Sequence, residues 1–93
     1  MNYSNRWYIT DQVLYVRYWH ESTPDIVIQQ IDEMYTLLNQ SSGSSIHVIV
    51  DATYVTKPLS AKDYPKLVGH YKTHPKYRWT LMVAQKNALI RFV

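Results

Sequence analysis

The chain has 93 residues, of which 46% are hydrophobic and 18% charged, and this balance predicts one small globular domain over residues 1–93. It contains no cysteine, which excludes disulfides, thiol catalysis and cysteine-based zinc sites. No apolar run approaches the roughly 20 residues that span a bilayer. The N-terminus also lacks the basic start and apolar core of a signal peptide. We therefore expect a cytoplasmic protein without a membrane span.

The formal net charge of +3 is unevenly distributed along the chain. Residues 1–46 hold two basic and five acidic residues, a net charge of −3, whereas residues 47–93 hold eight basic and two acidic residues, a net charge of +6. Such an asymmetry would steer an acidic partner or an anion toward the second half. The lysines are dispersed, however, and this dispersion is typical of ordinary solvated helix faces.

Residues 6–20, RWYITDQVLYVRYWH, predict two strands joined by a tight turn. Aromatic and β-branched residues dominate this stretch, and residues 10–12 supply the break between the strands. Side chains alternate between the two faces of a strand, so one alternating set of the second strand should face the core. The more apolar set comprises Leu14, Val16, Tyr18 and His20.

Residues 22–40, STPDIVIQQIDEMYTLLNQ, give the clearest helical pattern. Thr23 suits the N-cap and Pro24 the first helical position, while Asp25 favours the positive end of the helix dipole. Apolar residues recur at spacings of three and four, which predicts one buried stripe. That stripe consists of Val27, Ile31, Met34, Tyr35 and Leu38.

Two near-continuous apolar runs follow, SIHVIVDA at residues 45–52 and RWTLMVA at residues 78–84, with the helical pattern DYPKLVGHYKTH at residues 63–74 between them. Runs of this kind are typical of central strands that are covered on both faces. A strand, a helix and a strand in this order predict a crossover between parallel strands. The last stretch, QKNALIRFV at residues 85–93, indicates a short helix that Asn87 would cap.

The predicted fold is therefore a small α/β domain with the element order β-β-α-β-α-β. We expect a four-stranded mixed sheet, made of one antiparallel hairpin and two crossover strands, with both helices on one face and a short C-terminal helical segment. A helix of about one turn is not stable alone. The segment Ala88–Val93 therefore needs cover, either from the body of this chain, from a second copy in a homodimer, or from the rest of a longer domain.

This order of elements, and above all HVIVDATYVTKPLS at residues 47–60, resembles the STAS and STAS-like domains related to bacterial anti-sigma-factor antagonists. The resemblance extends over nearly the whole chain and implies a regulatory, protein-binding role. In the signalling branch of that family, a partner kinase phosphorylates a Ser or Thr at the start of the helix after this strand. Ser60 lies closest to that position, although Leu59 before it and Ala61 after it differ from the acid and the glycine of the signalling motif.

Ser60 also has a purely structural interpretation, because Ser60 and Asp63 form an S-x-x-D pattern that resembles a capping box. Pro65 would then fall inside the helix, where its ring clashes with the preceding turn. The alternative is a helix that begins at Asp63, with Pro65 in its first turn and Ser60 in the loop. Both interpretations stay open beside the phosphoacceptor.

Asp51 is placed by the pattern at the carboxyl end of a central strand, where ligands of open α/β sheets bind. It has no convergent base, nucleophile or metal partner in the sequence, so we expect it to accept backbone N–H groups rather than to act in catalysis. His70 and His74 share one helix face, but no acid lies between them, and no metal site is predicted.

Basic and aromatic residues interleave in the second half of the chain, a combination that can bind a nucleic-acid backbone and stack on bases. No known nucleic-acid-binding motif accompanies them, and nucleic-acid binding is not favoured. A glycine-rich phosphate loop is also missing from the sequence.

We therefore predict a non-enzymatic STAS-like protein-interaction or regulatory module with no catalytic residue, cofactor or metal, and with an unidentified protein partner. The contact surface is expected on the loop at residues 53–60 and the helix after it. Nucleic-acid or anionic-surface binding through the basic half, and small-ligand binding near Asp51, are the alternatives. The predicted contact residues are Asp51, Thr53, Tyr54, Thr56, Lys57, Ser60, Lys62 and Tyr64.

Overall fold

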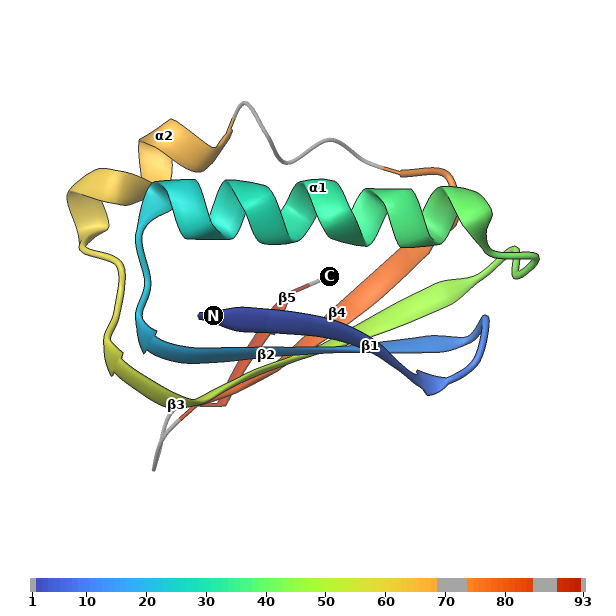
Figure 1. Cartoon of the computed structure of the whole chain (residues 1–93), viewed down its shortest axis with the longest axis horizontal. Helices are drawn as coiled ribbons and strands as arrows, with labels where there is room; N and C mark the ends of the chain where they lie inside the picture. Colours follow the sequence, from blue (N-terminus) through green and yellow to red (C-terminus); the bar gives the residue numbers. More distant parts are fainter. Residues whose placement is uncertain (1, 69–73, 85–88, 93) are drawn as a thin grey trace.

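The computed structural model describes residues 2–68, 74–84 and 89–92, which form one sheet with helices over one of its faces (Figure 1). None of the helices in these residues is long and apolar enough to cross a membrane. In chain order the elements are β1 (Tyr3–Ile9), β2 (Val13–Glu21), α1 (Pro24–Gln40), β3 (Ile46–Lys57), the 3₁₀ turn η1 (Ala61–Asp63), α2 (Tyr64–Val68), β4 (Tyr77–Val83) and β5 (Leu89–Phe92).

The strands lie in the sheet in their chain order, β1-β2-β3-β4-β5. β1 and β2 form the antiparallel hairpin, while β2–β3 and β3–β4 are parallel pairs, each connected through a helix. Figure 1 shows α1 and α2 on the same side of the sheet. The predicted α/β domain, with its four-stranded mixed sheet β1–β4 and helices on one face, is confirmed.

The predicted C-terminal helix is wrong for Leu89–Phe92, which form β5 antiparallel to β4. A single helical turn has few internal hydrogen bonds. The free edge of β4 instead offers a row of backbone donors and acceptors to a fifth strand. Ala88 and Val93, the ends of the predicted homodimer segment, lie outside the described residues, as do residues 69–73 of the predicted second helix.

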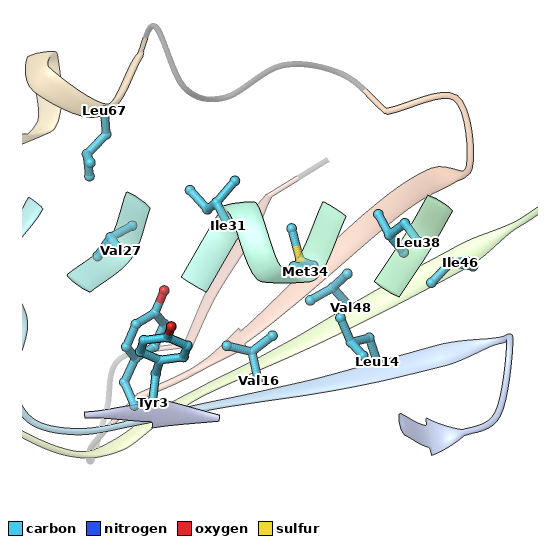
Figure 2. Packing of buried hydrophobic residues seen from close by; sticks show 11 residues of the cluster. Tyr3, Leu14, Val16, Val27, Ile31, Met34, Leu38, Ile46, Val48 and Leu67 are labelled. Carbon is cyan, nitrogen blue, oxygen red and sulfur yellow. The ribbon is translucent and has the colours of Figure 1, made fainter. Parts of the chain in front are cut away.

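α1 begins as its sequence predicts. The Thr23 side chain accepts the backbone N–H of Ile26 at 3.3 Å, and Pro24 occupies the first position of the helix. The apolar stripe packs on the sheet, where the side chains of α1 meet those of β2 and β3 (Figure 2). Tyr35 is only half-buried, whereas Gln30 is buried at 4% exposure. The buried residues of α1 are Val27, Gln30, Ile31, Met34 and Leu38.

Gln30 is buried because its amide is fully engaged between the helix and the hairpin. Its side-chain oxygen accepts the hydroxyl of Tyr18 at 2.6 Å, and its nitrogen donates to Asn5 Oδ1 at 2.9 Å. A buried polar group with such partners avoids the cost of desolvation. Gln30 is therefore part of the buried face of α1. The apolar pattern of the sequence did not predict this position, because its side chain is polar.

The core-facing set of β2 is confirmed for three of its four members. Leu14 and Val16 are fully buried and Tyr18 is 7% exposed, but His20 is exposed. His20 adopts a left-handed conformation, with φ 58°, and the pairing with β3 shifts between His20 and Glu21. This irregularity interrupts the alternation of side chains at the end of β2.

The hairpin turn and the end of α1 are fastened to each other. The Asp11 carboxylate accepts the hydroxyls of Ser41 at 2.6 Å and Ser42 at 3.0 Å. Gly43 lies against the backbone of Asp11, and a Cβ added to this glycine would lie 2.0 Å from the Asp11 carbonyl oxygen. Lys76 Nζ donates to the carbonyl of Leu38, at 3.0 Å, and to that of Ser41. Its positive charge lies at the C-terminus of α1, where it interacts favourably with the helix dipole.

β3 is longer than its apolar run predicts. The expected loop at residues 53–60 is wrong for Thr53–Lys57, which continue the strand and pair with β2 as far as Glu21 opposite Lys57. Tyr, Val and Thr in this stretch are good strand formers, and the long β2 supplies a partner for them. Only residues 58–60 separate β3 from η1.

Candidate functional site

The sheet has a second face, which neither α1 nor α2 covers (Figure 1). Successive side chains alternate, so the residues between the core positions of β2, β3 and β4 point to this side. We call it the open face. Among the described side chains it includes Arg6, Tyr8, Tyr15, Arg17, Trp19, His47, Ile49, Asp51, Tyr54, Trp79, Leu81 and Val83.

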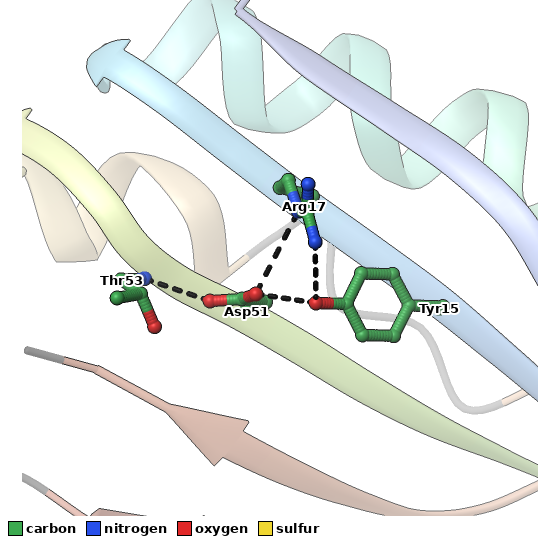
Figure 3. A network of polar contacts seen from close by, with 4 residues as sticks. All are labelled: Tyr15, Arg17, Asp51 and Thr53. Atoms are coloured by element: carbon green, nitrogen blue, oxygen red, sulfur yellow. Dashed lines mark hydrogen bonds and ion pairs between the residues drawn. The ribbon is translucent and has the colours of Figure 1, made fainter.

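A polar network joins β2 to β3 at the centre of the open face (Figure 3). Arg17 and Asp51 are register partners on the two strands. Asp51 Oδ2 accepts a short hydrogen bond from the Tyr15 hydroxyl, and its Oδ1 accepts the backbone N–H of Thr53 at 2.9 Å. Arg17 Nε lies 3.6 Å from Asp51 Oδ2, and Arg17 Nη2 donates to the Tyr15 hydroxyl at 3.2 Å.

The environment sets the protonation of this network. Burial raises the pKa of the Asp51 carboxyl, but hydrogen bonds from Thr53 and Tyr15, with the positive charge of Arg17, lower it by more, so that its net pKa lies below the ordinary value. Burial, together with the Asp51 carboxylate that the hydroxyl donates to, raises the pKa of Tyr15. At neutral pH the network therefore contains a carboxylate, a neutral phenol and a guanidinium.

Aromatic rings surround the guanidinium of Arg17. Its central carbon lies 5.1 Å from the ring centroid of Tyr54, 5.4 Å from that of Tyr15 and 5.9 Å from that of Trp19. Contacts of this length are in the range of cation–π attraction. The rings and the ion pair with Asp51 hold the arginine against the sheet, with 37% of its side chain exposed.

A second aromatic group lies across β3 and β4. The rings of His47 and Trp79 stack at a centroid distance of 4.3 Å. Trp79 is 43% exposed and Tyr54 52% exposed. The two groups give the open face an aromatic surface on β2, β3 and β4.

The predicted contact residues divide between two regions of the molecule. Asp51 and Tyr54 belong to the open face, although Asp51 lies within β3 rather than at its end. Asp51 was predicted to accept backbone N–H groups from the loop that follows it. It accepts the backbone N–H of Thr53, but Thr53 belongs to the strand and not to a loop. Thr56 is exposed on β3, and Lys57 forms an ion pair with Glu21 at 3.3 Å.

The other predicted contact residues lie where the chain rises from the end of β3 to the helical layer (Figure 1). Ser60 is exposed in the short loop and Lys62 is exposed in η1. Tyr64 is the first residue of α2, and its side chain lies outside the described part of the structure. The predicted residues therefore do not form one continuous surface.

Ser60 has a partner at the start of this helical segment. Its hydroxyl donates to Asp63 Oδ2 at 3.0 Å, and its carbonyl accepts the Asp63 backbone N–H at 2.9 Å. The hydrogen bond from Ser60 lowers the pKa of Asp63. α2 starts after η1, so Pro65 falls in its first turn and Ser60 stays in the loop, as the second structural interpretation predicts.

His74 is used in local packing. Its Nε2 is 2.7 Å from Asn39 Oδ1, and its ring lies 5.7 Å from that of Tyr35. His70 lies outside the described residues. Within residues 2–68, 74–84 and 89–92, no group of three or more His, Cys, Asp or Glu side chains is arranged to hold a metal ion.

Sequence reasoning missed Arg17, Trp19 and Trp79 as members of a common surface. A signal was present in β2, because the alternating set opposite the core residues places a cation between two aromatic residues. Its meaning depends on the register that brings Asp51 and Tyr54 beside Arg17.

Comparison of the chain with family models, curated proteins and solved structures gives no match in any of the three.

Proposed function

We propose that this chain is a non-enzymatic protein-interaction module, with the regulatory role that the STAS-like resemblance implies, and that it binds its partner through the open face. The observation that carries the proposal is the aromatic cluster around Arg17. Trp, Tyr and Arg are the residue types most enriched in the small groups that dominate binding energy at protein interfaces. Here all three types lie together on a sheet face without a covering helix.

The bonding of Asp51 supports a binding surface over a reaction centre. Both carboxylate oxygens accept hydrogen bonds from within the sheet, and Asp51 is only 8% exposed. A general base needs an accessible oxygen within hydrogen-bond reach of the substrate proton. The same bonding argues against a small ligand held by Asp51.

Nucleic-acid binding has one argument in its favour, because aromatic residues on an open sheet can also stack on the bases of single strands. Phosphate groups, however, need free cations nearby. At the centre of the open face Arg17 is paired with Asp51, and Lys57 is paired with Glu21. The remaining cations at described register positions of this face, Arg6 and Arg91, belong to the edge strands β1 and β5. Arg78 donates to carbonyls of its own chain, as Lys76 does. A protein partner therefore fits the open face better.

The test is affinity capture from the source cell with the chain as bait, followed by titration of the purified partner. Tyr54→Ser and Trp19→Ser remove rings from the open face, and Gln29→Ser is a matched control on the exposed side of α1. We expect wild type and Gln29→Ser to capture the same partner, and both open-face variants to bind it about 30-fold more weakly or worse. Equal affinity of all four proteins would contradict the proposal.

The phosphoacceptor role of Ser60 stays part of this proposal. Ser60 is exposed, and a phosphate there would replace the hydrogen bond to Asp63 with repulsion between two anions. Capture with Ser60→Ala and Ser60→Glu tests the idea, since a switch changes the affinity for the partner between these two variants. Identical binding by both removes Ser60 from the mechanism.

A further inference from the structure

The open face carries large apolar side chains that the described part of the chain leaves in contact with solvent. Tyr54 is 52% exposed, Trp79 43% and Val83 37%. Exposed apolar patches on a folded domain mark interaction sites. The two helices cannot supply the cover, because both lie on the other side of the sheet (Figure 1).

The size of the face matches one side of a stable protein interface. Five strands at a spacing of about 4.8 Å give a width of about 24 Å, and a strand of seven residues is about 23 Å long. The projected area is therefore about 550 Å², before the relief of the side chains is added. A specific complex buries about 800 Å² of accessible surface on each partner.

The charge at the centre of the open face is balanced, although the chain as a whole carries +3. Arg17 is compensated by Asp51 at the centre. The other cations at described register positions of this face lie on its two edge strands: Arg6 is opposite Tyr15 on β1, and Arg91 is opposite Leu81 on β5. Two such surfaces can meet through their neutral centres, with the edge cations at the rim of the contact.

We infer that the open face docks against the open face of a second copy of this chain, in a two-fold dimer with the sheets inside and the helices outside. This inference rests on the proposed function, because it assigns a partner to the same surface. Twisted sheets pack face to face at about 10 Å, with their strands about 30° apart, when their twists match. Two copies have the same twist by construction, and a two-fold axis uses the same patch on both.

The geometry of the aromatic cluster suits this arrangement. A two-fold axis that passes beside Arg17, rather than through it, sets the exposed part of each guanidinium over aromatic rings of the other copy. Such contacts strengthen when water is excluded. This surface differs from the segment Ala88–Val93 that the sequence predicted for a homodimer.

The experiment is light scattering after size-exclusion chromatography of the full chain, from about 1 to 200 µM, a range that resolves micromolar dissociation constants. We expect wild type to have the mass of two chains at the high end of the range. Tyr54→Asp and Trp79→Asp each place a charge on the open face and should raise the dissociation constant at least about 30-fold. Gln29→Asp, the same charge change on the exposed side of α1, should leave it unchanged, and circular dichroism confirms that each variant is folded.

Tryptophan fluorescence gives a second measurement that needs no substitution. Trp19 and Trp79 lie on the open face, whereas Trp7 packs against the core. In the dimer, acrylamide should quench the emission less, and dilution should restore quenching in parallel with the change in mass. A mass change without a change in quenching would place the dimer contact elsewhere and overturn the inference.

Three further outcomes overturn it. A wild-type monomer at every concentration excludes self-docking, and the proposed function survives if this monomer still binds another protein through Tyr54. A dimer that persists in both Asp variants locates the contact away from the open face. Binding of oligo(U) that falls steeply with salt and is lost in Tyr54→Asp would make the face a nucleic-acid platform, against both proposals.

Discussion

Asp51 shows how one buried carboxylate is kept charged. Burial favours the neutral form of its carboxyl group, but a phenol, a backbone N–H and a guanidinium favour the charged form, and each comes from a residue of β2 or β3. The sequence predicted its role as an acceptor of backbone N–H groups, because no catalytic partner accompanied it. Tyr15 and Arg17 were not predicted as its partners, since they are more than 30 positions away in the chain and only the register of β2 on β3 brings them together.

Substitution of Tyr15 by Phe tests the network at this scale. The change removes one donor to Asp51, and we expect a loss of about 1–3 kcal/mol of unfolding free energy at pH 7. The folded pKa of Asp51 is depressed, so its stabilisation is present above the unfolded pKa and is lost as the pH falls through the folded pKa. The difference between variant and wild type should therefore shrink as the pH falls through the folded pKa of Asp51, as measured by urea unfolding.

Tyr8→Phe is the matched control, because Tyr8 lies on the same face but is 68% exposed. We expect it to change the unfolding free energy by less than about 0.5 kcal/mol. A Tyr15→Phe effect of the same size at neutral and acidic pH would show that lost packing, rather than the hydrogen bond to Asp51, causes the destabilisation.

At the scale of elements, local signals predicted the hairpin and α1, while pairing decided the rest. The turn at Asp11 and the cap at Thr23 depend on residues that are close in the chain, so both can be predicted from a local sequence pattern. The extension of β3 through Tyr54 and Val55 depends on the length of β2. The strand at Leu89–Phe92 depends on the free edge of β4, and the same apolar residues suit a helix equally well in isolation.

The junction between the hairpin turn and the end of α1 gives a prediction for Gly43. A Cβ in Gly43→Ala would lie 2.0 Å from the backbone carbonyl oxygen of Asp11, so the backbone must move. We expect a loss of about 2–3 kcal/mol of unfolding free energy, in the upper part of the range of about 1–3 kcal/mol that is typical of overpacking. Ser44→Ala, at the exposed neighbouring position, is the control, with an expected change within about 0.5 kcal/mol in urea unfolding. Equal midpoints for the two variants would show that the loop relaxes freely.

In the described structure both helices lie on one face of the sheet, as predicted, and they leave the other face open. The apolar runs of β3 and β4 suggested strands covered on both faces, but in the described structure the helices cover one face only. Aliphatic and aromatic side chains such as Ile49 and Trp79 have the same apolar character whether a helix of the same chain or a partner covers them. A sequence pattern records that these positions are apolar and does not record what covers them.

Three carboxylates with depressed pKa values, Asp11, Asp51 and Asp63, determine the expected response of the whole molecule to acid. Each contributes stability that is present above its unfolded pKa and is lost as the pH falls through its folded pKa. The urea midpoint, at a fixed protein concentration, should therefore fall steadily below about pH 4. Asp51→Asn should flatten this profile, and a wild-type midpoint that stays constant down to about pH 2 would contradict the assignment of these shifts.

The order of the strands has a consequence for how the fold is made. Each strand of β1-β2-β3-β4-β5 lies beside the strand that precedes it in the chain. During synthesis, every new strand therefore meets an edge that already exists, and none has to enter between two strands that are already paired. Assembly can proceed from the N-terminus at the pace of the ribosome, with α1 closing over the hairpin while β3 is being added.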